Sequence, residues 1–121
     1  MTTSIALDPI INRHIEAVNN FDLDGVMTTI ADDALVNDNM REFWGRDHIR
    51  AFFAKEMIGD HVTLDTVEVV DNDGMWCVRC KYDGDYDKTG LPDPLIMTNY
   101  FRVVGDKIVT LFIVNNTKPK Y

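Results

Sequence analysis

Apolar residues in the first half of the chain recur at the three- and four-residue spacing of amphipathic helices. A first helix is expected to begin at Asp8-Pro9, a cap followed by proline. Its apolar face carries Ile11, His14, Ile15 and Val18. A second helix is expected on Leu23, Val26, Met27 and Ile30. A third, capped by Asp47 and ended by Gly59-Asp60, is expected on Ile49, Phe52, Phe53 and Met57.

The period changes to two from residue 62 onward, which is typical of strands. Long strands are predicted at residues 62–70, 75 to about 85, 95–104 and 107–115. After the second helix, Ala31-Asp32-Asp33-Ala34 leads into a short strand at 35–38. Phe43-Trp44 is expected to form a second short strand that completes a small hairpin with it. Helices followed by a meander of strands predict an α+β fold, with the helices packed on one face of a curved antiparallel sheet.

The last two strands allow a prediction of which side chains share a face. If Gly105-Asp106 is a two-residue hairpin loop, the paired residues are Val103 with Ile108, Phe101 with Thr110, and Asn99 with Phe112. The side chains then expected to point inward are Met97, Asn99, Phe101 and Val103. Those expected on the opposite face are Tyr100, Arg102, Val109, Leu111 and Ile113. That outer face is too apolar to be left in water, so we expect a homodimer formed through it.

Composition limits the class of protein. The 121 residues are 45% hydrophobic and 26% charged, which is ordinary for one folded domain spanning 1–121. A net charge of −8 repels phosphate backbones and anionic lipids, so neither nucleic acid nor a membrane surface is an expected partner. The N-terminus has no basic region before a long apolar run, and no stretch approaches the roughly 20 apolar residues of a membrane helix, so we expect a cytoplasmic protein.

Two patterns suggest metal binding but lack the residues it requires. Cys77 and Cys80 have the C-x-x-C spacing, yet no second cysteine pair exists and residues three apart on a strand point to opposite faces. Alternating Asp83, Asp85 and Asp87 resemble the start of a calcium loop, but Lys88 replaces its glycine and Pro94 its final acid. We therefore expect neither metal nor cofactor. The loop at 85–94 is interpreted as a rim or dimer contact.

One carboxylate has an unusual position. On the short strand 35–38, period two places Val36 and Asp38 on the same side, so Asp38 points inward if Val36 faces the core. An inward acid at a strand end is rarely left without a partner. Two interpretations remain: Asp38 contacts a ligand, or it only bonds to its own hairpin through Asn39 or Arg41. His14, on the apolar face of a helix, is by itself more typical of a core histidine.

Four stretches carry a resemblance to a known family: D-L-D-G at 22–25, A-D-D-A-L-V-N-D at 31–38, G-R-D-H-I-R-A-F-F at 45–53, and N-Y-F-R-V-V-G-D-K-I at 99–108. With them the chain resembles the nuclear transport factor 2-like superfamily, in its SnoaL-like and ketosteroid-isomerase-like branch. The resemblance implies a cone-shaped α+β barrel with three N-terminal helices packed on a curved antiparallel sheet. This fold carries isomerases, dehydratases, cyclases, epoxide hydrolases and plain binding domains.

The resemblance also implies a site. In ketosteroid isomerases an aspartate moves a proton beside a carbonyl, while a tyrosine and a protonated aspartate bind the oxyanion. Asp38 matches the base, Asn99 the oxyanion aspartate and His14 the tyrosine. The last two depart from the pattern, although an amide or an imidazole can still donate a hydrogen bond. An apolar surround would bring the proton affinity of Asp38 nearer to neutral pH.

The walls of such a cone are expected to be apolar and to suit a hydrophobic ring. The residues expected to bind substrate are Phe21, Phe43, Trp44, Phe53, Met97, Phe101 and Phe112. Two functional classes remain open. One is a cofactor-independent isomerase-like enzyme, or a related dehydratase or cyclase, that uses Asp38 for proton transfer on a small hydrophobic carbonyl or polycyclic compound. The other is a non-catalytic ligand-binding or dimerisation domain of the same fold.

Overall fold

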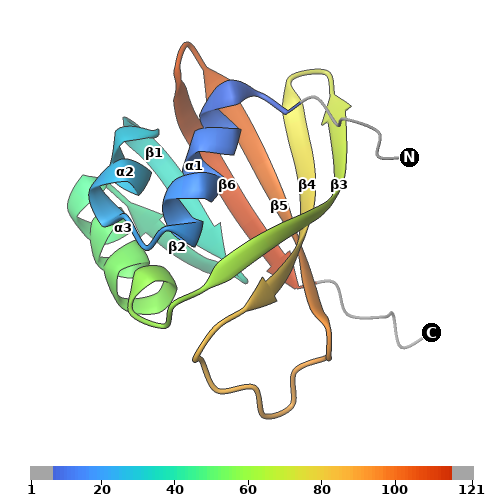
Figure 1. The fold of residues 1–121 in the computed structure, drawn as a ribbon. Coiled ribbons are helices and arrows are strands. Elements are labelled where there is room, and N and C mark those ends of the chain that lie inside the picture. The colour runs from blue at the N-terminus through green and yellow to red at the C-terminus, as the bar shows by residue number, and fades with distance from the viewer. Residues whose placement is uncertain (1–6, 116–121) are drawn as a thin grey trace.

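The computed structural model describes residues 7–115 (Figure 1). The N-terminal residues 1–6, part of the segment inspected for a targeting sequence, lie outside this range. The helices are α1 (Pro9–Asn19), α2 (Leu23–Thr28), α3 (Arg46–Phe52) and the π-helical turn η1 (Phe53–Ile58). The strands are β1 (Ile30–Asp38), β2 (Arg41–Trp44), β3 (Thr63–Asn72), β4 (Met75–Asp83), β5 (Leu95–Val104) and β6 (Lys107–Asn115).

The six strands form one sheet in the order β2-β1-β6-β5-β4-β3. All neighbouring strands run antiparallel except β1 and β6, which are parallel. The helices gather on one side of the sheet, with α1 crossing in front of its central strands (Figure 1). The α+β class is therefore confirmed, but the sheet is mixed. No hairpin constrains β1 against β6, which explains why a meander read from sequence missed their parallel pairing.

The first helix forms as its pattern predicts. The Asp8 carboxylate accepts the Ile10 N–H at 3.0 Å and Pro9 occupies the first turn, so the start of α1 is capped. The apolar face of α1 packs into the core against the sheet and the other helices. Core side chains that are at most 1% exposed include Ile11, Val18, Val26, Val36, Ile49, Phe53 and Phe101.

The second and third helices differ from prediction at their ends. Helix α2 stops at Thr28, because Ile30 pairs with Ile108 and the Thr29 carbonyl accepts the Ile108 N–H at 2.8 Å. Residues 31–34, expected to connect the helix to a strand, are therefore already part of β1. Gly45, with φ of 84°, is the residue preceding α3, and Asp47 lies in its first turn without capping it. After Phe52 the helix widens into η1.

The predicted pairing of the last two strands is right only beside the hairpin. Val103 pairs with Ile108 as expected, but Phe101 then pairs with Leu111 and Asn99 with Ile113. A bulge between Arg102 and Val103 of the ladder shifts the partner strand by one residue, which moves its side chains to the other face. Leu111 and Ile113, predicted to face outward, are therefore in the core at 2% exposure each.

Candidate functional site

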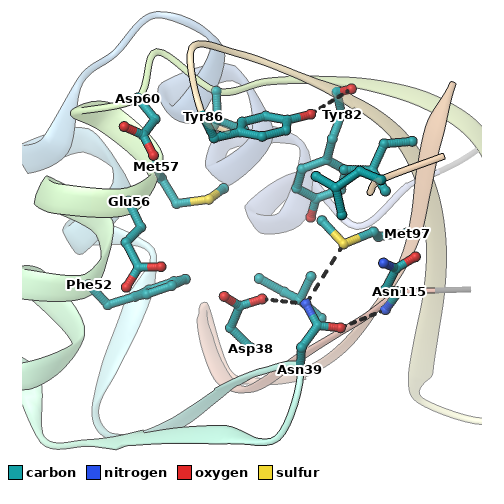
Figure 2. Close-up of a pocket in the computed structure, with 14 residues that line it drawn as sticks. Asp38, Asn39, Phe52, Glu56, Met57, Asp60, Tyr82, Tyr86, Met97 and Asn115 are labelled. Carbon is teal, nitrogen blue, oxygen red and sulfur yellow. Dashed lines mark hydrogen bonds between the residues drawn. The ribbon is translucent and has the colours of Figure 1, made fainter. Parts of the chain in front are cut away.

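A cavity of about 220 Å³ opens between η1, the end of β1 and the loop that joins β4 to β5 (Figure 2). Most of its wall is apolar or aromatic. The main wall residues are Phe52, Met57, Tyr82, Tyr86, Leu95, Met97 and Ile113. The side chains that bring polar groups to it are Asp38, Asn39, Glu56, Asp60 and Asn115. An apolar chamber with a few polar groups at its edge is the usual form of a small-molecule site.

Asp38 reaches this cavity from the last position of β1. Val36, two residues earlier, is fully buried, so the inward direction inferred from period two holds. The Asp38 side chain is 16% exposed. Its carboxylate accepts from Arg41 Nη2 at 2.5 Å and from Asn39 Nδ2 at 3.0 Å. Both hairpin partners considered from the sequence are thus present, and Asp38 lines the cavity as well.

Arg41 ties this carboxylate to a second one across the site. Its guanidinium donates to the two oxygens of Glu56 at 2.6 and 3.0 Å, in the bidentate geometry that arginine favours. The hydrogen bonds that Arg41 donates to Glu56, and to a smaller extent the one that it donates to Asp38, raise the pKa of Arg41 above its ordinary value. The Arg41 side chain is 52% exposed, so solvent screens part of this interaction. The ion pairs connect β2 to η1 at the edge of the cavity.

His14, matched to an oxyanion donor, lies in the core and does not line the cavity. Its Nδ1 is 3.0 Å from Thr29 Oγ1, whose own hydroxyl donates to the Val26 carbonyl at 2.6 Å. The imidazole must therefore donate from Nδ1. Its ring packs in T-shaped geometry against Phe53 and Phe101, and burial lowers its pKa to about 4. His14 is a neutral core histidine at pH 7.

Asn99 is also inward and buried, but its amide is already bonded. Its Oδ1 accepts from the Tyr82 hydroxyl, and its Nδ2 donates to the Val78 carbonyl at 3.0 Å. Tyr82, which the sequence did not single out, forms part of the cavity wall, and burial raises its pKa well above the ordinary value. The structure thus brings Asp38 to the cavity without the two predicted donors.

The predicted wall residues are distributed over several environments. Met97 lines the cavity, and Phe43 stacks on the wall residue Phe52 with ring centroids 4.6 Å apart. Phe53 and Phe101 are core residues. The remaining three do not line the cavity: Phe21 and Trp44 are 41% and 59% exposed, and Phe112 neighbours the inward Leu111 and Ile113 in the bulged strand.

The sequence did not predict most of the lining residues, and those among them that bring polar atoms include Glu56, Asp60, Tyr82, Tyr86 and Asn115. Glu56 lies seven residues after Ile49 and four after Phe52, so helical spacing alone places it on the same face as these apolar residues, and in the structure it lines the cavity from η1. Tyr86 comes from the loop at 85–94, which therefore contributes to the wall. No periodicity reports the position of a loop residue.

Neither cysteine nor acidic loop forms a metal site in the structure. Within residues 7–115 no group of three or more His, Cys, Asp or Glu side chains could hold a metal ion. Cys77 and Cys80 are free thiols, and Cys80 is buried. Asp83 pairs with Lys88 and Asp85 with His61, each at 2.8 Å. No helix in the described range is long and apolar enough to cross a membrane.

Solved structures share this fold. A protein of Sinorhizobium meliloti named a putative polyketide cyclase has a TM-score of 0.79 and 23% identity, over 88% of this chain and 94% of that one. A second protein of that name, from Xanthomonas campestris pv. campestris, has a TM-score of 0.71 and 26% identity over 88% and 87%. A protein with a ketosteroid isomerase-like fold from Catenulispora acidiphila, in complex with trimethylamine, has a TM-score of 0.74 and 17% identity over 92% and 88%.

Among proteins with curated descriptions, none is a significant match to this sequence. The family-level comparison is decisive where individual relatives are distant. The SnoaL-like domain matches residues 11–111, a range that begins in the first turn of α1 and ends within β6. The fold, the neighbours and this match agree with the resemblance inferred from sequence, and the chain belongs to the SnoaL-like domain family.

Proposed function

We propose that this protein binds a small, mainly apolar carbonyl compound in the cavity and that Asp38 moves a proton on it, as an isomerase-like enzyme without a cofactor. The observation that carries the proposal is the Asp38 carboxylate, 16% exposed, at the edge of an apolar chamber. A carboxylate in such a position can take a proton from the carbon beside the carbonyl and return it to the same or another carbon.

The size of the chamber limits the size of the compound that can bind in it. Pockets for drug-sized ligands measure roughly 300–1,000 Å³, and this cavity of about 220 Å³ is smaller. A single ring fits this size better than a polycyclic compound. The ion pair with Arg41 would hold the Asp38 carboxylate in place while the ring lies against Phe52 and Met97.

A non-catalytic ligand-binding domain is the second candidate. It is favoured by a specific observation: His14 and Asn99, the residues matched to oxyanion donors, do not line the cavity. Asp38 would then serve the hairpin through its bonds with Asn39 and Arg41.

Deuterium exchange separates the two candidates. Cyclohexanone in deuterated buffer loses its α-protons slowly, and NMR follows their loss. A base positioned by a protein accelerates proton transfer by about 10²–10⁴-fold, so we expect a clear acceleration by the wild type that Asp38→Asn removes. Asp33→Asn changes an exposed aspartate of the same strand outside the cavity and should leave the rate unchanged.

Each alternative outcome has a definite meaning. If Asp38→Asn exchanges as fast as the wild type, Asp38 is not the base. If cyclohexanone binds, as seen from shifted protein resonances, but exchanges only at the buffer rate, the protein is the binding domain of the second candidate.

We also propose a homodimer through the face of the sheet opposite the helices. In the corrected register that face carries Tyr100 paired with Phe112, in place of the predicted Leu111 and Ile113. Its remaining apolar side chains still favour association.

A further inference from the structure

The side chains that line the cavity carry an excess of negative charge. Three of them, Asp38, Glu56 and Asp60, are carboxylic acids, and none is a lysine, arginine or histidine. Arg41 offsets part of this charge from outside the lining through its pairs with Asp38 and Glu56. One guanidinium against three carboxylates still leaves the site negative, and apolar walls strengthen the field that such charges produce.

Asp60 is the carboxylate that remains available. Within residues 7–115 no group bonds to its side chain, whereas Arg41 and Asn39 engage the other two acids. Figure 2 shows the Asp60 and Glu56 carboxylates on the same side of the cavity, with the Tyr86 ring beside them. A carboxylate facing an apolar chamber is costly unless a donor or a cation meets it.

The remaining walls suit a cation with a hydrocarbon body. Phe52, Tyr82 and Tyr86 present aromatic rings to the cavity, and ring faces attract ammonium groups. Lys88 lies 5.7 Å from the Tyr86 ring centre, but it pairs with Asp83 and does not line the cavity. No side chain of the protein therefore occupies the cation position inside.

We propose that the ligand of this cavity carries an ammonium group, held by Asp60 with help from Glu56, on a small hydrocarbon ring. The inference rests on the proposed small-molecule function and narrows its ligand class: a carbonyl compound of about one ring that also carries a primary or secondary amine. The ring contacts Phe52 and Met97, and the N–H groups of the ammonium donate to the Asp60 carboxylate.

The test compares three probes of nearly equal size and different charge: cyclohexylmethylamine, cyclohexylmethanol and cyclohexanecarboxylate. Titration of the wild type, followed by calorimetry or protein NMR, should show the amine binding at least about tenfold more tightly than the alcohol, and the carboxylate not binding. Asp60→Asn should reduce amine affinity to that of the alcohol and leave alcohol affinity unchanged. Asp73→Asn, which removes the same charge at an exposed turn, should keep the preference.

The outcomes separate this inference from the function on which it rests. Equal binding of alcohol and amine, or tighter binding of the carboxylate, overturns the cation preference and leaves the cavity a ligand site. A preference that survives Asp60→Asn overturns the role of Asp60. Failure of all three probes to bind, with cyclohexanone exchange still accelerated, overturns the inference and leaves the proposed function. Failure of the probes and of cyclohexanone overturns both.

Discussion

His14 illustrates how much the surroundings of one residue decide. The sequence places it on the buried face of α1, and the family resemblance gives it a donor role. The structure surrounds it with Phe53, Phe101 and the Thr29 hydroxyl, which accepts its Nδ1 proton. The imidazole serves packing and one internal hydrogen bond, and its distance from the cavity removes it from any direct contact with a ligand there.

Burial of this imidazole makes stability depend on pH. The pKa of His14 is about 4 in the folded protein and about 6.5 when unfolded, so between these values the unfolded chain binds more protons. Stability is complete above the unfolded pKa and is lost as pH falls toward 4. We expect this group to cost about 2 kcal/mol of unfolding free energy between pH 7 and pH 5.

Urea denaturation at the two pH values measures this loss. His14→Gln should make the difference smaller by that amount, whatever its effect at neutral pH. His48→Gln alters an exposed histidine and should preserve the wild-type difference. An unchanged pH dependence in His14→Gln would show that His14 does not resist protonation.

Asp38 and Asn99 mark what residue-level patterns can predict. Period two gave the inward direction of both side chains correctly. It could not give their partners, because those depend on which distant groups the fold brings near: Tyr82 and Val78 for Asn99, and Arg41 for Asp38. The direction of a side chain follows from the backbone, whereas its availability to bind a ligand depends on its tertiary contacts.

At the scale of elements, the β1–β2 hairpin positions Asp38. Its two turn residues, Asn39 and Met40, have φ of 50° and 77°, the left-handed region that strains most side chains. Asn39 tolerates this and bonds to Asp38 and to the Asn115 N–H. Met40 is 90% exposed and gains nothing comparable from its side chain.

Met40→Gly should therefore stabilise the protein. Asn-Gly is the preferred sequence for a two-residue hairpin turn with positive φ at both positions, and we expect a gain of about 0.5–1 kcal/mol in unfolding free energy. Met40→Ala removes the same apolar surface without relieving φ and should show no gain. Chemical denaturation of the three proteins decides the matter, and equal stability of the Gly and Ala variants would contradict the argument.

Helices and strands could be predicted where the apolar residues follow a single period, and were misplaced where their spacing fits both the helical and the strand period. Strand β6 reads K-I-V-T-L-F-I-V-N, with apolar residues at both parities, so its pattern does not specify a face. The bulge that sets its register costs only a local irregularity and leaves no mark in the sequence. Ile30 is a similar case: it fits the helical spacing of Leu23, Val26 and Met27, but its pairing with Ile108 places it in β1.

At the scale of the whole molecule, one row of paired strands on the outer face of the sheet carries Cys77, Tyr100 and Phe112. The rows on either side of it carry Arg79 paired with Thr98 and Arg102 paired with Thr110. By the same pairing Trp44 and Val114 project from this face, and they are 59% and 39% exposed. The helices cover the opposite side (Figure 1). Exposed apolar side chains grouped on one face favour association with a second copy.

We therefore expect a dimer in sedimentation velocity at micromolar concentration. Phe112→Lys places a charge in the middle of the outer face, where burying it against a second copy would be costly, so this variant should sediment as a monomer with an unchanged circular dichroism spectrum. Met40→Lys adds the same charge at the exposed hairpin tip and should leave the dimer intact. A monomeric wild type would contradict the dimer directly. A dimer that survives Phe112→Lys would place the interface on another surface. The strand residues Asp38, Met97 and Ile113, which line the cavity, lie on the inner face of the sheet, so ligand binding should be the same in dimer and monomer.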